Sequence, residues 1–336
     1  MDKAMGGGGI WFMLCVGLLS TSASAAELRL NDIQMLGSHN SYKQSLPLVS
    51  RVVLSLFRPE LIDTLDYQHP PLTEQLDFGL RKLELDVFYD PKGTLFGQYA
   101  HAGGISHFAV LHVQSVDDAS NCPNLKACIT DIAAWSRAHP GHLPLFISIN
   151  AKDAPVDWMG AVEPQAFDDA AWDRLDEEFE EVLGDRLIRP ASVIGPTGPV
   201  WPPLSEARGR IVVVLDERGL KRERYARKWP TRSLFADHHP EHPAAAIRVL
   251  NDPIADFDRI RDLVEWGYIV RTRADADTVE ARNGDTERRD RAFESGAQLI
   301  STDYYRPAEG TGYVVRLPRG ANVRCNPVRV TGECPL

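Results

Sequence analysis

The sequence predicts an α/β protein of the (β/α)8 TIM-barrel type, for three reasons. Strand-like apolar runs alternate with helical patterns over most of the chain after residue 26. No Gly-rich phosphate loop follows a strand, which disfavours a nucleotide-binding fold and a nucleotide cofactor. Polar residues suited to catalysis stand at or just past several predicted strand ends, where barrel enzymes build their sites. These residues are His39, Asn40, Glu84, Asp86, His112, Asn150, Arg271 and Asp303.

The predicted strands are short runs, either wholly apolar or alternating with polar residues. They cover residues 33–36, 80–88, 109–113, 144–149, 211–215, 268–271 and 298–301. Apolar residues three and four apart predict helices over 172–183, 254–264 and 285–295, with Gly296 closing the last. We expect the tail, 317–336, to be a clip appended to the barrel.

One apolar segment, 46–57, follows the His39-Asn40 pair closely and has near-helical spacing. We interpret it as a barrel helix whose apolar side chains pack on the core. The alternative is that it touches a membrane at the rim of the barrel.

The chain has 336 residues and a formal net charge of -10, which argues against nucleic acid as a partner. Its start resembles a secretory signal peptide, with Lys3, an apolar stretch over 10–19 and small residues at 23–25. We therefore predict a signal peptide over 1–25, cut after Ala25 or Ala26, and a single catalytic domain over 26–336. The protein would be secreted or periplasmic.

Four cysteines remain after such a cleavage, and secretion favours their oxidation to disulfides. Of the three possible connectivities, the local pairs Cys122–Cys128 and Cys325–Cys334 are favoured. A zinc site is disfavoured because no close Cys-x-x-Cys spacing occurs.

Glu84 and Asp86 are two residues apart, so both carboxylates point to one face of their strand, opposite Leu83, Leu85 and Val87. In a barrel strand that face is the lumen, where unpaired carboxylates are costly. A bound cation would neutralise them. The alternative is a buried salt bridge to Arg81 or Lys82.

The oxygen-rich set of Asn40, Glu84 and Asp86 suits Ca²⁺ or Mg²⁺, and secretion favours Ca²⁺. A fourth ligand should come from another strand end. Asn150, which closes the run 145–149, is the best placed, and Asp153 is the alternative.

A second histidine is needed beside His39 to protonate a leaving alkoxide, and His112 closes a predicted strand. His101 and His107 compete with it but lie in or next to a Gly-rich loop. We expect the other histidines, which lie in loops beside or near prolines, on the surface. They are His69, His139, His142, His238, His239 and His242.

Several segments in order resemble the secreted calcium-dependent phosphoinositide-specific phospholipases C, within the PLC-like phosphodiesterase superfamily. The resembling segments are 36–42, 72–76, 81–87, 110–113, 146–153, 270–275, 284–286 and 296–304, and they span nearly all of the mature chain. The resemblance implies a distorted (β/α)8 barrel with one Ca²⁺ at the strand carboxyl ends.

Position by position, the resemblance implies metal ligation by Asn40, Glu84 and Asp86. It implies that His39 stabilises the transition state and that His112 is the general acid. Asn150 falls where the better-known eukaryotic enzymes carry a glutamate ligand, so the fourth ligand is Asn150 or Asp153. Two basic residues are predicted to contact the phosphate or the inositol hydroxyls. These are Lys152 and Arg271.

We therefore predict a monomeric, Ca²⁺-dependent phospholipase C that cleaves phosphatidylinositol at a membrane surface. The products would be diacylglycerol and an inositol phosphate, with Glu84 as a candidate proton acceptor. One alternative is a glycerophosphodiester phosphodiesterase, disfavoured because Asn40 and Ser41 follow His39 in place of Arg-Gly. The other is a secreted ligand-binding relative that has lost catalysis.

Overall fold

The computed structural model describes Met1 and residues 27–97, 106–158, 160–332 and 334–336. The predicted signal peptide and His101 lie outside these described residues. Within the described ranges, no helix combines the length and the apolar character needed to cross a bilayer.

Eight parallel strands form a nearly closed barrel, which confirms the predicted fold class. Their order is β8-β7-β4-β2-β1-β11-β10-β9, and a single bridge between Asp237 and Ile247 joins the two ends. The barrel strands are β1 (Ile33–Ser38), β2 (Lys82–Tyr89), β4 (Leu145–Ala151), β7 (Ile211–Leu215), β8 (Phe235–Ala236), β9 (Ile247–Val249), β10 (Ile269–Arg273) and β11 (Leu299–Thr302).

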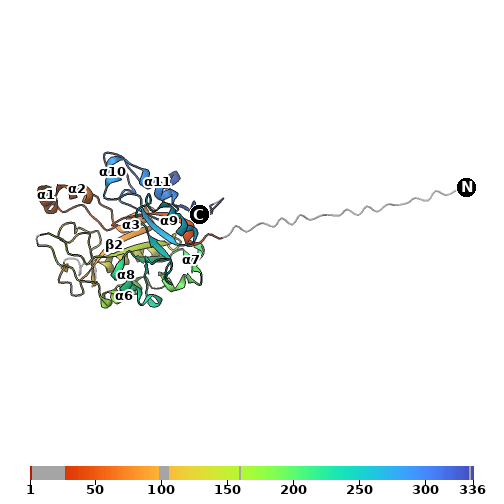
Figure 1. Ribbon diagram of the computed structural model, residues 1–336, viewed down its shortest axis with the longest axis horizontal. Helices are drawn as coiled ribbons and strands as arrows, with labels where there is room; N and C mark the ends of the chain where they lie inside the picture. Colours follow the sequence, from red (N-terminus) through yellow and green to blue (C-terminus); the bar gives the residue numbers. More distant parts are fainter. Residues whose placement is uncertain (2–26, 98–105, 159, 333) are drawn as a thin grey trace.

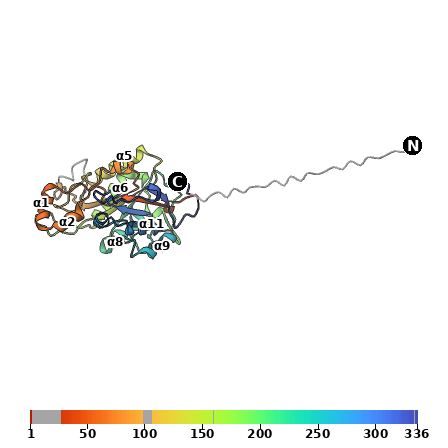
Figure 2. The ribbon, with the colours of Figure 1, turned by 90° about the horizontal axis from the view of Figure 1, so that it is seen from above.

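Helices surround this sheet, and Figures 1 and 2 show α1 and α2 together at one end, away from α9 and the C-terminus. The α-helices are α1 (Leu48–Phe57), α2 (Pro59–Leu65), α3 (Leu72–Asp77), α5 (Leu125–Ala138), α6 (Asp169–Leu183), α7 (Leu204–Ala207), α8 (Gly219–Ala226), α9 (Phe257–Glu265), α10 (Val279–Asn283) and α11 (Glu287–Glu294). The 3₁₀ turns are η1 (Leu30–Asp32), η2 (Gly184–Arg186), η3 (Pro190–Ser192), η4 (Trp229–Thr231) and η5 (Pro318–Gly320).

Successive side chains of β2 point alternately to the apolar core outside the barrel and to the candidate site inside it. The outward residues Leu83, Leu85 and Val87 of β2 belong to one buried apolar cluster with α5 and α6. The intervening Glu84 and Asp86 are buried on the other face, beside their β4 neighbours across the parallel register. This period of two therefore places both acids inside the barrel, as predicted.

The first strand has an unusual pair of neighbours on its β2 side. Only Gly37 pairs with β2, at Lys82, whereas residues Ile33–Met35 pair with the antiparallel strand β12 (Val323–Cys325). The chain end thus fills the gap where β1 and β2 diverge. The expectation that 317–336 is only an appended clip is wrong, because β12 is part of the main sheet.

Several strands differ from the sequence prediction. The predicted run 109–113 overlaps β3 (Phe108–Val110), which pairs antiparallel with β2 and lies outside the barrel order. The barrel strands β8 and β9 were not predicted, because two and three residues are too short to show a period. A small hairpin, β5 (Ile194–Gly195) with β6 (Gly198–Pro199), completes the strands.

Helix α1 does not pack on the core as we expected from segment 46–57. Of its ten residues only Ser50 and Leu54 are buried, and five of its large apolar side chains are exposed. The helical spacing was predicted correctly, and the direction of its apolar face was wrong.

Both predicted disulfides are present, Cys122–Cys128 and Cys325–Cys334. The first joins the loop before α5 to the start of that helix, and the second joins the end of β12 to the segment that follows it.

We predict that Gly37→Ala destabilises the protein. A Cβ at this position would overlap the Cβ and carbonyl oxygen of Lys82, and its Cδ lies only 2.7 Å away. Overpacking of this kind lowers the free energy of unfolding by about 1–3 kcal/mol. Urea unfolding measures it, with Gly141→Ala as control because a Cβ there meets no atom within 4 Å. Equal midpoints for both variants would contradict the prediction.

Candidate active site

The turn after β1 presents the first two site residues. His39 and Asn40 follow Ser38 directly, and Asn40 has a φ of 43°, a left-handed conformation that Asn tolerates better than most residues. The turn fastens to β2 through Ser41, whose N–H donates to the Glu84 carbonyl at 3.0 Å. Ser41 Oγ accepts from the Glu84 N–H at 2.8 Å. The backbone therefore fixes His39 relative to Glu84.

His39 lies between two carboxylates and a guanidinium. Its Nδ1 is 2.9 Å from Asp303 Oδ1, and its Nε2 is 3.7 Å from Glu84 Oε1. Arg273 Nη2 lies 3.3 Å from the same Nδ1. Burial, with Arg273, lowers the pKa of His39, while Asp303 and Glu84 oppose this shift.

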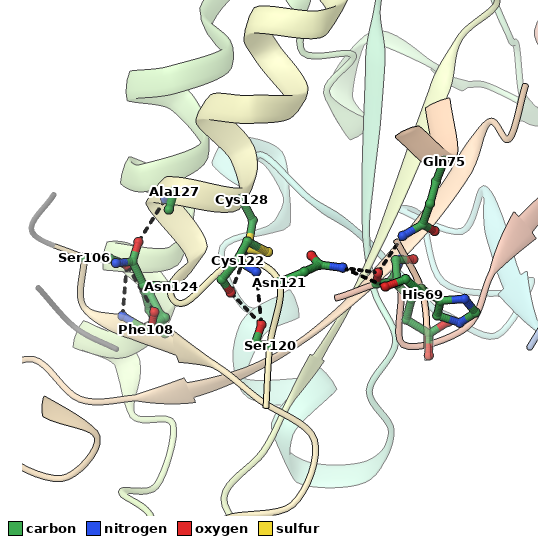
Figure 3. The surroundings of a disulfide bond; sticks show 12 residues. His69, Gln75, Ser106, Phe108, Ser120, Asn121, Cys122, Asn124, Ala127 and Cys128 are labelled. Atoms are coloured by element: carbon green, nitrogen blue, oxygen red, sulfur yellow. Dashed lines mark hydrogen bonds between the residues drawn. A yellow bond between two sulfur atoms is a disulfide. The ribbon is translucent and has the colours of Figure 1, made fainter. Parts of the chain in front are cut away.

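The segment from Tyr67 to His69 supports the turn from the outside. The Asn40 amide donates to the Tyr67 hydroxyl at 2.8 Å, and His69 Nε2 lies 2.9 Å from the His39 carbonyl oxygen. Asn121, beside the first disulfide, donates to the Pro70 carbonyl at 3.0 Å, and Figure 3 shows its side chain pointing toward this segment. The disulfide loop is thus tied to the segment that supports the His39-Asn40 turn.

His69 is therefore not the surface residue we expected. It is buried, and burial is the main reason that its pKa falls to about 4. His142 and His238 are also buried, which corrects the same expectation for them. Burial likewise lowers the pKa of His238, to about 3.

Glu84 and Asp86 receive compensating charge from three cations. Glu84 pairs with Lys82 on its own strand and with Arg271 Nη2 at 2.7 Å, whereas Asp86 Oδ2 lies 3.1 Å from Lys152 Nζ. Burial raises the pKa of Glu84, but Arg271 and Lys82 outweigh it and hold that pKa well below the usual range. The buried salt bridge that we considered as the alternative to a cation is therefore present between Glu84 and Lys82. Arg81 instead donates to the Leu76 and Leu80 carbonyls.

Asn150 joins the two acids. Its Nδ2 lies 3.2 Å from Glu84 Oε1 and 3.0 Å from Asp86 Oδ1. Asp153, the alternative fourth ligand, instead pairs with Lys221 Nζ at 3.1 Å. Of the two, Asn150 contacts the predicted metal ligands.

His112 lies two residues past β3 and has its own carboxylate partner. Its Nδ1 is 2.7 Å from Asp117 Oδ2, and Lys43 Nζ lies 3.2 Å from the other oxygen of Asp117. His112 lines a cavity of about 380 Å³ together with Asn150 and Lys152. His107, its competitor, pairs with Glu178 at 2.9 Å.

The donor set fits a hard cation. Within the described ranges no three carboxylate, imidazole or thiol groups gather as a metal cluster, so an ion held beside Glu84 and Asp86 would also need amide oxygens as ligands. The oxygen and nitrogen of an amide are assigned from its hydrogen bonds, and turning the Asn150 amide would direct its oxygen at Glu84 Oε1 and Asp86 Oδ1. Three oxygens converging in this way would be a ligand set of the kind that Ca²⁺ accepts.

Some site residues had no predicted role. Asp303 was noted at a strand end, but its pairing with His39 depends on the neighbouring positions of β1 and β11. Asp117 lies five residues after His112 in a turn that showed no pattern. Tyr67 and Arg273 carried no sequence signal for their contacts with the His39-Asn40 turn.

The model of the family described as "Phosphoinositide phospholipase C, Ca2+-dependent" matches residues 28–327. The chain belongs to this family. Membership supports a phosphodiesterase of the phosphoinositide phospholipase C type. The barrel, with the candidate site at its strand ends, agrees with this assignment.

Solved structures agree on the fold. A calcium-dependent phosphoinositol-specific phospholipase C from Pseudomonas sp., in apo form with myoinositol, is 18% identical with a TM-score of 0.58. The match covers 89% of this chain and 96% of that one. A Ca²⁺-dependent phosphatidylinositol-specific phospholipase C from Streptomyces antibioticus is 17% identical, with a TM-score of 0.52 and coverage of 82% and 95%. No curated protein sequence matches significantly.

We predict that Asp303→Asn reduces phosphodiester cleavage about 10–100-fold while the fold persists. The change removes the charged partner that orients the His39 ring through Nδ1. Initial rates on phosphatidylinositol and thermal unfolding measure the two effects. Asp185→Asn, at an exposed position, is the matched control. A wild-type rate in Asp303→Asn would show that the ring needs no such partner.

Proposed function

We propose that the protein cleaves phosphatidylinositol to diacylglycerol and an inositol phosphate, using His39 and His112. The supporting observation is that each imidazole is held by a carboxylate at Nδ1, and that a cluster of Glu84, Asp86 and Asn150 lies beside them. The family match supports the phosphoinositide class of substrate.

His112 is the proposed general acid. Asp117 contacts its Nδ1 and would stabilise the imidazolium, which leaves Nε2 to give its proton to the glycerol oxygen as the phosphorus–oxygen bond breaks. The inositol 2-hydroxyl oxygen forms the new bond to phosphorus, so the first product is a cyclic inositol phosphate. His39, which is oriented by Asp303, would stabilise the charge that develops on the phosphoryl oxygens.

Glu84 is the proposed acceptor of the 2-hydroxyl proton, although its pairs with Arg271 and Lys82 make it a weak base. Asn40, Glu84, Asp86 and Asn150 are the proposed Ca²⁺ ligands. A bound Ca²⁺ would polarise a phosphoryl oxygen and lower the pKa of the attacking hydroxyl.

Lys152 and Arg271 are the proposed substrate contacts. Lys152 is partly exposed in the cavity that His112 lines, where its ammonium can reach a phosphate. Arg271 is buried and bound to Glu84 and Asp216, so it suits a role in holding Glu84 as much as one in contacting inositol.

The proposed setting is outside the cytoplasm. Two disulfides support secretion or a periplasmic location, as would the predicted signal peptide over 1–25. The family match over 28–327 supports a single catalytic domain over 26–336, which we propose acts as a monomer on membrane phospholipid.

A substrate comparison tests the function. We expect the purified mature protein with Ca²⁺ to cleave phosphatidylinositol in mixed micelles faster than glycerophosphoinositol, and a chelator to abolish this cleavage. Phosphorus NMR of the products measures both. Preference for glycerophosphoinositol would instead indicate a glycerophosphodiester phosphodiesterase, and cleavage of neither would indicate a binding protein.

We predict that His39→Ala and His112→Ala each lower the rate about 10²–10⁴-fold, as expected for the loss of one acid–base or charge-stabilising group. The control is His239→Ala, since His239 is exposed with 64% of its side chain accessible. Circular dichroism should show all three variants folded. Turnover like that of the wild type in either of the first two would remove that histidine from the mechanism.

A further inference from the structure

We propose that a cavity between helix α8 and the loop after β8 binds a small oxyanion of the phosphate class. The cavity has a volume of about 320 Å³ and shares no lining residue with the cavity that His112 lines. The site is therefore separate from the proposed phospholipase site and does not depend on it. Its polar lining consists of two arginines and one glutamate from α8 and its end, and of three histidines from the loop. They are Arg222, Glu223, Arg227, His238, His239 and His242.

The two arginines give the cavity a positive character. Arg222 Nη1 donates to the Asp237 carbonyl at 3.0 Å, which fixes this side chain beside the loop. Glu223 is the one carboxylate among the described lining residues, and its Oε1 already lies 3.8 Å from Arg222 Nη2. Arg227, directly after the last residue of α8, is exposed and forms no ion pair with any described residue. One guanidinium is therefore left to neutralise an anion.

His238 is the strongest sign that this cavity takes a ligand. Only 5% of the residue is exposed, yet neither of its ring nitrogens has a hydrogen-bond partner in the part of the chain that the structure describes. Buried polar groups in proteins nearly always have such a partner. The ring stacks on that of His242, with centroids 3.9 Å apart and 13° between the planes. A ligand in the cavity would supply the missing partner.

Both stacked rings are neutral and lie in a positive field. His242 Nδ1 accepts from the Ala244 N–H at 3.1 Å, so the proton of the neutral ring is on Nε2, where it can be donated to a ligand. Burial is the main reason that the pKa of His238 falls to about 3, and His242, Arg222 and Arg248 act in the same direction. Charges that oppose an imidazolium at this place favour an anion there.

The same features disfavour a metal ion. Two guanidiniums would repel a cation, and nearly parallel stacked rings do not direct their nitrogen lone pairs at one ion lying about 2.0–2.1 Å from each. Within the described ranges no three histidine, cysteine or acidic side chains are placed to hold a metal. A guanidinium is instead suited to phosphate, whose oxygens it binds through two N–H groups.

Titration with inorganic phosphate and with glycerol 2-phosphate, a phosphate monoester, tests the proposal. Protein with ¹⁵N-labelled histidine is followed by NMR at constant ionic strength, and the variants H238Q and H242Q assign the two ring signals. We expect the signals of His238 and His242 to shift saturably with phosphate and not with sodium chloride. The stronger of the two phosphate responses distinguishes free phosphate from a phosphate ester as the source of the anion.

Arg227→Gln should weaken this binding about tenfold or more, because a hydrogen bond to a charged group is lost. The matched control is Arg259→Gln on α9, which makes the same change in charge at a side chain that is 51% accessible, and it should leave the affinity unchanged. Both variants should cleave phosphatidylinositol like the wild type. If thermal unfolding shows that Arg227→Gln is not folded, H242Q repeats the measurement through the signal of His238.

The absence of a saturable shift with either phosphate probe would overturn the proposal. So would an equal loss of affinity in Arg227→Gln and Arg259→Gln, because binding would then depend on net charge alone. Saturable binding of Zn²⁺ at the two rings, without a response to phosphate, would show a metal site in place of an oxyanion site.

Discussion

The site depends on compensating two carboxylates that β2 carries inside a barrel. Glu84 and Asp86 are almost fully buried, and an isolated ion at such a position is strongly disfavoured. Lys82 and Arg271 form ion pairs with Glu84, and Lys152 forms one with Asp86. These contacts come from three strands or their ends, so the same electrostatic requirement ties β2, β4 and β10 together at the top of the barrel.

The same compensation shapes the proposed metal site. Asn150 supplies an amide where a carboxylate would add a third negative charge, and three cations already balance the two acids. A divalent ion would have to share Glu84 and Asp86 with them. Lys152 is the most exposed of the three, so its ion pair with Asp86 is the one that can rearrange at least cost.

The features that could be predicted from the sequence are those that local spacing encodes. The alternation along β2 placed both acids on the lumen face, and short Cys spacings gave both disulfides. It could not say which way the apolar face of α1 points, because the spacing of a helix is the same whether that face meets a core or a solvent. Nor could it find Asp303 as the partner of His39, since that contact depends on two strands far apart in the chain.

The pairing of β1 with β11 and β12 has a consequence for how the chain folds. The two strands that pair with most of β1, β11 and β12, come near the end of the sequence. The contacts of β1 therefore join residues that are far apart in the chain, which gives them a high contact order. Such a barrel cannot close until its final segment is available, and loop closure over that distance makes folding slow. During synthesis the first strand therefore has to wait for almost the whole chain before it gains the partners on its two edges.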